Sequence, residues 1–329
     1  MKKLLPHSLI FAPLEGITDD IYREVIAKNY EEWDFLAADF FRVPRIASSH
    51  DKIIKKHLGP FFSERPDQLK KIIFQILTSQ LDDIEPICEQ VQNLGITCLD
   101  LNAGCPMKRV VFHKGGSYLL SSPPELQNII SRMRKKFSRF LSVKIRIGLT
   151  DDKNFFEILR LLEGEGVDAI TLHGRLQTQM YQGKADWDYI SKATKFLKIP
   201  LIGNGDILTP KNAEQMYKQT NCHSLMIGRG AMRAPWLAGL IKSGNKKLQL
   251  PDLKNEIKKY LTLIHTACLE AQLPDDSSLC RIKSLCPTLF DDFQNSKEVR
   301  QRALRARCFE EIREAVEELS LEESGAKNK

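Results

Sequence analysis

Ile96-Thr97-Cys98-Leu99-Asp100-Leu101-Asn102-Ala103-Gly104-Cys105-Pro106 is the stretch that decides the fold. Its apolar first half predicts a buried strand, and its second half puts an Asn and a Cys on the loop that leaves the strand. Gly104 permits a tight turn and Pro106 fixes the next backbone angle, so the loop presents the thiol of Cys105. A small cysteine that only lines a turn is the alternative interpretation of such a residue taken alone.

Eight short runs of this β type recur along the chain, mostly with amphipathic segments between them. The segments 82–94, 155–163 and 212–219 have the helix boundary signals of nearby Gly residues or of Thr209-Pro210. This alternation predicts an α/β fold with a parallel sheet, and eight units predict a TIM (β/α)8 barrel. A doubly wound open sheet is the alternative, but no G-x-G-x-x-G follows the first run. The runs are Leu9–Ala12, Asp34–Ala38, Ile72–Ile76, Thr97–Leu101, Leu141–Ile147, Ala169–His173, Ile199–Gly203 and Ser224–Ile227.

Strand signals stop at about Gly244. Apolar residues then recur at helical spacing, as at Leu253, Ile257 and Leu261, which predicts a small all-helical domain. We therefore expect a barrel domain over residues 1–243 and a helical domain over residues 244–329 that ends in a short polar tail.

The chain of 329 residues has a net charge of +7, and its basic residues are clustered at 42–56, 108–114, 132–146 and 297–307. Several such clusters favour a polyanionic partner, although a solvated surface is the better interpretation of any single one. The eight cysteines show neither Cys-x-x-Cys nor zinc-site spacing, which predicts no metal site and free thiols in a reducing cytoplasm. Pro6 and His7 interrupt the only signal-like start, and no run is long enough to span a membrane.

Glycine-rich loops follow the seventh and eighth predicted strands, at Gly203-Asn204-Gly205 and Gly228-Arg229-Gly230. These two loops are the usual phosphate site of this barrel, because glycines let backbone N–H groups approach phosphate oxygens. Arg229 would add charge-assisted hydrogen bonds. The loops therefore predict a phosphate-bearing cofactor, with plain turns as the alternative.

Polar side chains also occur near the ends of the predicted strands. Lys144 and Arg146 alternate with apolar neighbours, so both should point into the barrel near its mouth, where buried cations need anionic partners. A reduced flavin ring is such a partner, and His173 and Gln75 could contact it as well. A core histidine is the alternative for His173 alone. Cys105, with an ordinary thiol pKa of about 8.5, is a candidate general acid.

Together these motifs resemble the signature of the tRNA-dihydrouridine synthase family. The helical tail with Arg281-Ile282-Lys283 and the segment 38–43 look most like the bacterial C-type enzymes, which modify uridine 16 in the D-loop. The matching segments are Ala12–Gly16, Leu101–Pro106 with Gly116 and Leu119-Leu120, Val143–Arg146, His173–Arg175, Asn204–Asp206 and Gly228–Gly230.

The resemblance implies FMN-dependent reduction of a uracil in tRNA, with NADPH as the electron source. A hydride would go to C6 of the base, and Cys105 would protonate C5. The residues expected to hold the base are Asn102, Arg146 and Tyr181, and those expected to bind tRNA phosphates are Arg42, Arg281, Lys283 and Arg300. The residues expected at FMN are Ala12, Pro13, Leu14, Gln75, Lys144, His173, Asn204, Gly205, Asp206, Gly228 and Arg229. Access for the tRNA D-loop and elbow favours a monomer.

Leu14, Ser117-Tyr118 and Leu176 depart from the family pattern without removing a proposed chemical group, so they bear on substrate choice more than on reaction type. Two other functions stay open. An FMN barrel of the dihydroorotate or dihydropyrimidine type would act on a free pyrimidine and would not need the helical domain. A non-catalytic tRNA-binding protein would not need Cys105, Asn102, Lys144 and His173 together.

Overall fold

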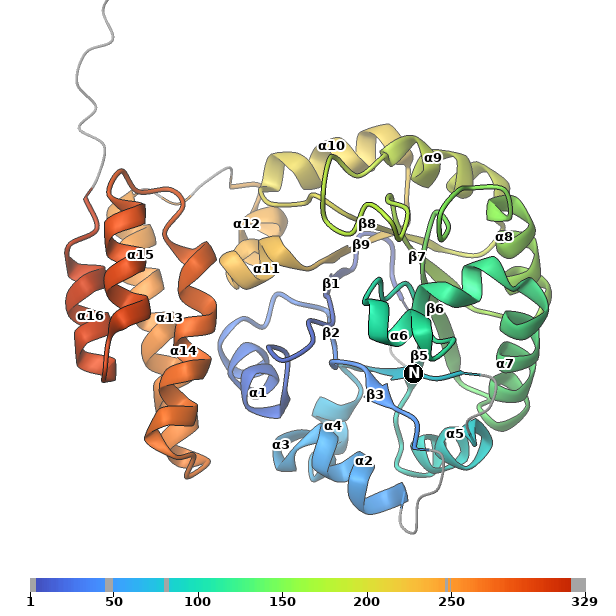
Figure 1. Ribbon diagram of the computed structural model, residues 1–329, viewed down its shortest axis with the longest axis horizontal. Coiled ribbons are helices and arrows are strands. Elements are labelled where there is room, and N and C mark those ends of the chain that lie inside the picture. Colours follow the sequence, from blue (N-terminus) through green and yellow to red (C-terminus); the bar gives the residue numbers. More distant parts are fainter. Residues whose placement is uncertain (1–3, 45–49, 80–82, 246–247, 249, 321–329) are drawn as a thin grey trace, which may run out of the picture.

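Eight parallel strands close into a barrel in the computed structural model, which describes residues 4–44, 50–79, 83–245, 248 and 250–320 (Figure 1). The barrel closes because β2 pairs with both β1 and β4, while β1 also pairs with β9. The predicted TIM barrel is therefore confirmed. The barrel strands are β1 (Leu9–Phe11), β2 (Phe35–Ala37), β4 (Ile72–Leu77), β5 (Cys98–Ala103), β6 (Phe140–Arg146), β7 (Ala169–His173), β8 (Leu201–Asn204) and β9 (Ser224–Ile227). A two-residue strand, β3 (Phe41–Arg42), is added to β4 and was not predicted.

The barrel interior changes from apolar to polar along its axis. At the amino-terminal end, Ile10, Phe35 and Ile73 belong to a small buried cluster that fills the interior. Further along, Asp100 pairs in register with Ser142 and Asn102 with Lys144, and Arg146 is beside His173. Successive side chains of a strand alternate between its faces, so these polar residues share the interior face. The barrel is thus packed at one end and polar at the carboxyl ends of its strands, where barrel enzymes have their sites.

Helices surround the barrel, and three of them test the boundaries expected from the sequence. α5 runs from Ile84 to Asn93, α8 from Phe155 to Gly164, and α10 from Pro210 to Thr220. α10 begins two residues earlier than expected because Thr209 and Asn212 form a reciprocal capping box around Pro210. The remaining elements of this part are α1 (Asp20–Asn29), α2 (His50–Leu58), α3 (Pro60–Ser63), α4 (Pro66–Leu69), α6 (Lys108–Phe112), η1 (Gly116–Ser121), α7 (Pro123–Lys136), α9 (Trp187–Phe196), α11 (Arg229–Arg233) and α12 (Leu237–Ser243).

Four further helices form a bundle beside the barrel, next to α1 and α11 (Figure 1). They are α13 (Leu250–Glu270), α14 (Asp275–Leu289), α15 (Ser296–Arg305) and α16 (Phe309–Glu317). A buried hydrogen bond of 2.7 Å from the Tyr260 hydroxyl to that of Tyr22 joins the bundle to α1, and Arg281 forms an ion pair with Asp19. The expected helical region is confirmed, whereas its independence as a domain from residue 244 stays a prediction. The predicted tail lies outside the described residues.

Cysteines fall into two groups by exposure. Cys280 on α14 and Cys308 before α16 are exposed, and the other six are buried and free. Within the described ranges, no group of three or more His, Cys, Asp and Glu side chains could hold a metal ion. No helix in those ranges is both long enough and apolar enough to cross a bilayer.

Candidate active site

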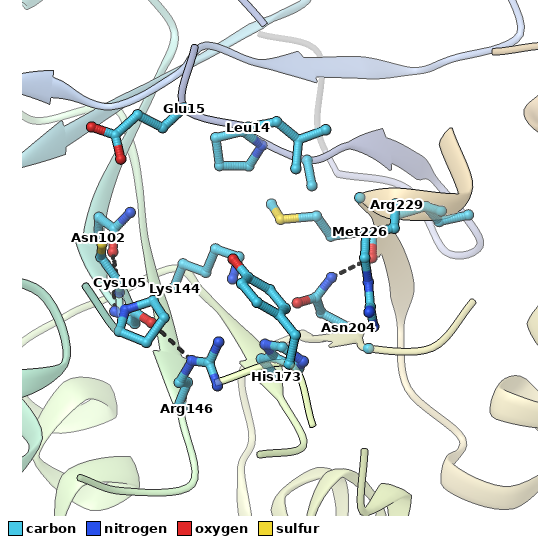
Figure 2. A pocket seen from close by; sticks show the side chains of 18 of the residues that line it. Leu14, Glu15, Asn102, Cys105, Lys144, Arg146, His173, Asn204, Met226 and Arg229 are labelled. Carbon is cyan, nitrogen blue, oxygen red and sulfur yellow. Dashed lines mark hydrogen bonds between the residues drawn. The ribbon is translucent and has the colours of Figure 1, made fainter. Parts of the chain in front are cut away.

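A cavity of about 330 Å³ opens at the carboxyl ends of the barrel strands (Figure 2). It brings together side chains from the loops after β1, β5, β7, β8 and β9. Gln75 does not line it, and neither do Arg42, Arg281, Lys283 and Arg300. The expected site residues that do line it are Ala12, Pro13, Leu14, Asn102, Cys105, Lys144, Arg146, His173, Tyr181, Asn204, Gly205, Asp206, Gly228 and Arg229.

The Cys105 loop is held from both sides by hydrogen bonds. Asn102 Oδ1 accepts from the backbone N–H groups of Gly104 and Cys105 at 3.1 and 2.8 Å. Ser117 Oγ donates to the carbonyl oxygen of Cys105 at 2.8 Å. Gly116 has φ +59°, and a Cβ there would lie 2.9 Å from that carbonyl oxygen, so only glycine fits. The loop therefore holds the thiol in one place.

The Cys105 thiol is protonated near neutral pH. Burial raises its pKa above the ordinary thiol value, and Glu15 acts in the same direction. The backbone N–H of Met107 and the charges of Arg42 and Lys144 oppose this rise without cancelling it. A neutral thiol beside the cavity is suited to donate a proton rather than to attack as a thiolate.

A chain of hydrogen bonds beneath the cavity orients Asn102. Gln75 is fully buried there, and its Nε2 donates to Asp100 Oδ2 at 2.7 Å while its Oε1 accepts from Asn102 Nδ2 at 2.8 Å. Ser142 Oγ donates to the other oxygen of Asp100 at 2.5 Å. An ionised carboxylate only accepts, so Asp100 sets the direction of each amide and points Asn102 Oδ1 at the Cys105 loop. Sequence reasoning missed Asp100, although its even spacing from Asn102 places both on one strand face.

Positive charge gathers at the floor of the cavity. Lys144 points toward its middle (Figure 2), and none of the described carboxylates forms an ion pair with it. Burial, and then the neighbouring charge of Arg146, lowers the pKa of Lys144 to about 8. Burial and the cations around it, Lys144 first, hold the pKa of His173 well below its ordinary value, so its ring is neutral.

Arg175 and Asp206 organise the phosphate-site loops. The buried Arg175 contacts both carboxylate oxygens of Asp206 at 2.8 and 2.7 Å and also contacts His173 Nε2 at 3.0 Å. A guanidinium only donates, so Nε2 accepts and the His173 proton is on Nδ1. Asp206 also accepts from Arg229 at 2.8 Å, and Gly205 has φ +117° with a Cβ position only 2.9 Å from the His173 ring. Arg175 lay inside a motif quoted from the sequence but was not predicted as a site residue.

Arg146 ties two loops together at the mouth of the cavity. It donates from Nε to the Gly104 carbonyl at 2.9 Å and from Nη1 to the Met180 carbonyl at 2.8 Å. The half-exposed ring of Tyr181 lies near two guanidinium groups, 5.6 Å from that of Arg146 and 5.4 Å from that of Arg229. Both contacts are within cation–π distance, so they favour this position of the Tyr181 ring at the cavity.

The residues expected to bind tRNA phosphates lie outside the cavity. Arg42 is close to it, forms an ion pair of 3.2 Å with Glu15, and lies over the Phe40 ring. Arg281 and Arg300 are in the helical bundle, paired with Asp19 and Asp291. Lys283 lies half-buried on α14. Their roles in binding stay predictions.

The donor set fits a flavin mononucleotide. Lys144 needs an anionic partner, which a reduced ring supplies, and neutral His173 offers an Nδ1–H donor. Arg229 and the loops after β8 and β9 offer charge and backbone N–H groups to a phosphate. The closed barrel with its cavity at the carboxyl ends of the strands has the architecture of a barrel enzyme, and the donor set of that cavity indicates the class of flavin-dependent oxidoreductases.

The comparisons with known proteins agree with this class. Residues 10–324 match the family model described as dihydrouridine synthase (Dus), and the chain belongs to that family. It is therefore an enzyme of the tRNA-dihydrouridine synthase type.

A Neisseria meningitidis serogroup B protein named tRNA-dihydrouridine(16) synthase is 26% identical over 95% of each chain. A Shewanella oneidensis protein of the same name is 30% identical over 72% of this chain and 75% of its own. A 2-naphthoyl-CoA reductase structure shares the fold, with a TM-score of 0.54, 12% identity, and 72% of this chain and 50% of that chain covered.

Proposed function

We propose that this enzyme reduces the C5=C6 bond of uridine 16 in the tRNA D-loop to 5,6-dihydrouridine, with FMN as its flavin and NADPH as electron source. The observation that carries the reaction is a protonated Cys105 thiol at the wall of a cavity whose floor is cationic. The choice of uridine 16 is supported by two relatives that bear this position in their names, one of which matches 95% of the chain.

FMN would be held by the residues at the floor and the phosphate-site loops. Lys144 and the His173 Nδ1–H would face the ring, and Arg229 would bind the phosphate. Asn204 donates its amide to the Met226 carbonyl at 2.7 Å, which leaves its Oδ1 for the ligand. Pro13 and Leu14 supply an apolar wall. Asp206 would position Arg229 by their ion pair, and Gln75 would position Asn102 by their hydrogen bond.

When bound at these residues, FMN would supply the hydride that C6 of the uracil accepts, and NADPH would be the source of its electrons. Cys105 transfers its Sγ proton to C5 and then takes a proton from water, so one NADPH and one proton are consumed for each base. Because the thiol is already neutral near pH 7, no second group must protonate it before each turnover. Asn102 and Arg146 hold the loop against which the base would lie. The base must leave the tRNA fold to reach this cavity.

The helical bundle and barrel rim would bind the remaining tRNA. Lys283 would contact phosphates directly, whereas Arg42, Arg281 and Arg300 would first exchange a carboxylate partner for a phosphate. One chain contains all of the residues invoked here, so we propose that a monomer is active. Light scattering of the enzyme with and without tRNA would test that state.

The test is a map of dihydrouridine in tRNA from a strain without this gene, with the wild-type or Cys105→Ala gene restored in parallel. Loss at position 16 that only the wild type reverses supports the reaction, the position and the acid. Loss at another D-loop position would keep the reaction and replace the position. An unchanged map would contradict the proposal and favour a free pyrimidine substrate. Oxidation of NADPH and NADH by the purified protein would then decide the electron donor.

A further inference from the structure

An exposed aromatic ring lies on a basic surface next to the cavity. The α6 surface consists of Met107, Lys108, Arg109, Phe112 and Lys114, all of them exposed. Phe112 is 82% exposed, the largest value among the large apolar residues of the described chain. Met107 is 48% exposed and lines the cavity itself. The Phe112 ring is therefore exposed at the end of a short helix, α6, that begins beside the candidate active site.

The α6 surface is fixed relative to the Cys105 thiol. Val110, the buried residue of α6, packs with Leu77 and Cys105. The backbone N–H of Gly115 returns to the Val110 carbonyl at 3.1 Å, and a Cβ on Gly115 would lie 3.1 Å from the Thr78 carbonyl oxygen. A group bound to Phe112 would thus have a set position relative to the group that Cys105 protonates.

The cationic side chains of the α6 surface are not paired with acidic side chains within the described ranges. None of Lys108, Arg109 and Lys114 forms an ion pair with a carboxylate in the ranges that the structure describes. Arg281 and Arg300, by contrast, are both paired with Asp residues. An aromatic ring among uncompensated cations is the combination that binds unpaired nucleotides, by base stacking and by phosphate contact.

We propose that Phe112 stacks on an unpaired tRNA base beside the target uridine, while Lys108, Arg109 and Lys114 contact the phosphates around it. This inference rests on the proposed function. When the uridine leaves the tRNA fold, its neighbours lose a stacking partner, and the Phe112 ring replaces part of that loss. Phe112 is thus a positioning residue that acts on substrate binding, outside the cavity where the chemistry occurs.

The test compares tRNA affinity and turnover for Phe112→Ala, Phe112→Trp and Phe112→Leu. We expect Phe112→Ala to raise the Kd and KM for tRNA roughly 5- to 150-fold, the range that loss of one stacked base gives, with kcat nearly unchanged. Phe112→Trp should restore binding and Phe112→Leu should not. The flavin content and NADPH oxidation without tRNA should stay at the wild-type level, because the side chain is outside the cavity.

Salt dependence separates stacking from phosphate contact. Phe112→Ala should leave the slope of log affinity against log salt unchanged, whereas Lys108→Ala should reduce it by about 1. Leu5→Ala is the matched control, because Leu5 is 60% exposed and precedes β1 at the opposite end of the barrel. It should leave affinity and slope unchanged.

Wild-type affinity in Phe112→Ala would overturn the proposal, and so would full rescue by Phe112→Leu. If Phe112→Ala lost binding to anionic phosphatidylserine vesicles but kept its tRNA affinity, the proposal would be overturned in favour of a membrane surface. The binding titration needs no turnover. A wild-type protein that binds tRNA but reduces no uridine would therefore refute the proposed function and still leave the Phe112 result readable.

Discussion

Replacing Asp100 by Asn should remove a pH-dependent penalty from the stability of the fold. Asp100 is fully buried, and burial raises its pKa from 3.8 to about 6 despite hydrogen bonds from Ser142 and Gln75. The folded state therefore holds this proton more tightly than the unfolded state does. The stabilisation is complete below about pH 4 and is lost as pH rises through about 6, a change of roughly 3 kcal/mol by pH 7.

The assay is urea unfolding of both proteins at several pH values between 4 and 7, with matched flavin content and tryptophan fluorescence as the signal. Asn does not ionise, so the free energy of unfolding of Asp100→Asn should gain roughly 2.5 kcal/mol relative to wild type between pH 4 and pH 7. Other titrating groups, such as Asp39, are present in both proteins and cancel in the difference.

Ser142→Ala provides the matched control. It removes a hydrogen bond that lowers the Asp100 pKa and keeps the titrating carboxylate, so the pH dependence should become steeper. A difference between Asp100→Asn and wild type that stays constant from pH 4 to pH 7 would refute the reasoning.

The remaining predictions concern the cavity and the bundle contact. Cys105→Ala should keep its flavin and lose uridine reduction by about 10²–10⁴-fold in a single-turnover assay; a smaller loss would argue against the acid. Flavin Kd should rise as pH passes about 8, where Lys144 loses its charge, and Lys144→Met should remove that dependence in a fluorescence titration. Arg229→Ala should weaken FMN retention by about 1.5–3 kcal/mol, measured by dialysis, with Arg229→Lys intermediate. Tyr260→Phe should lower the free energy of unfolding by about 1–3 kcal/mol because Tyr22 loses its buried partner, and the double change with Tyr22→Phe should recover much of that loss.

The barrel could be predicted because its evidence is local. Apolar runs, capping residues such as Thr209 and a glycine such as Gly95 mark elements within a few residues, and eight repeats of one unit limit the topology. β3 escaped prediction because a strand of two residues has no periodicity. Its pairing of Phe41 with Ile76 depends on the tertiary fold.

The residue types that form the site could be predicted from the sequence better than the depth of each side chain in the barrel or the partner to which it hydrogen-bonds. The alternation along a strand shows that Gln75 faces the interior, but not that it lies below the cavity and binds Asp100 instead of lining the wall. The pairing of Arg281 with Asp19 joins positions 262 residues apart, which no local pattern reveals. Arg175 was overlooked because its role depends on the loops that it joins.

The uneven exposure of the cysteines makes the chain suitable for selective labelling without engineered substitutions. Cys280 and Cys308 are the exposed thiols, and both belong to the helical bundle. Burial raises the pKa of Cys88 and of Cys286 to about 12, so these two would react slowly with maleimides. A fluorophore added to the native protein would therefore mark the bundle, and its emission would follow the approach of a large ligand to that side of the molecule.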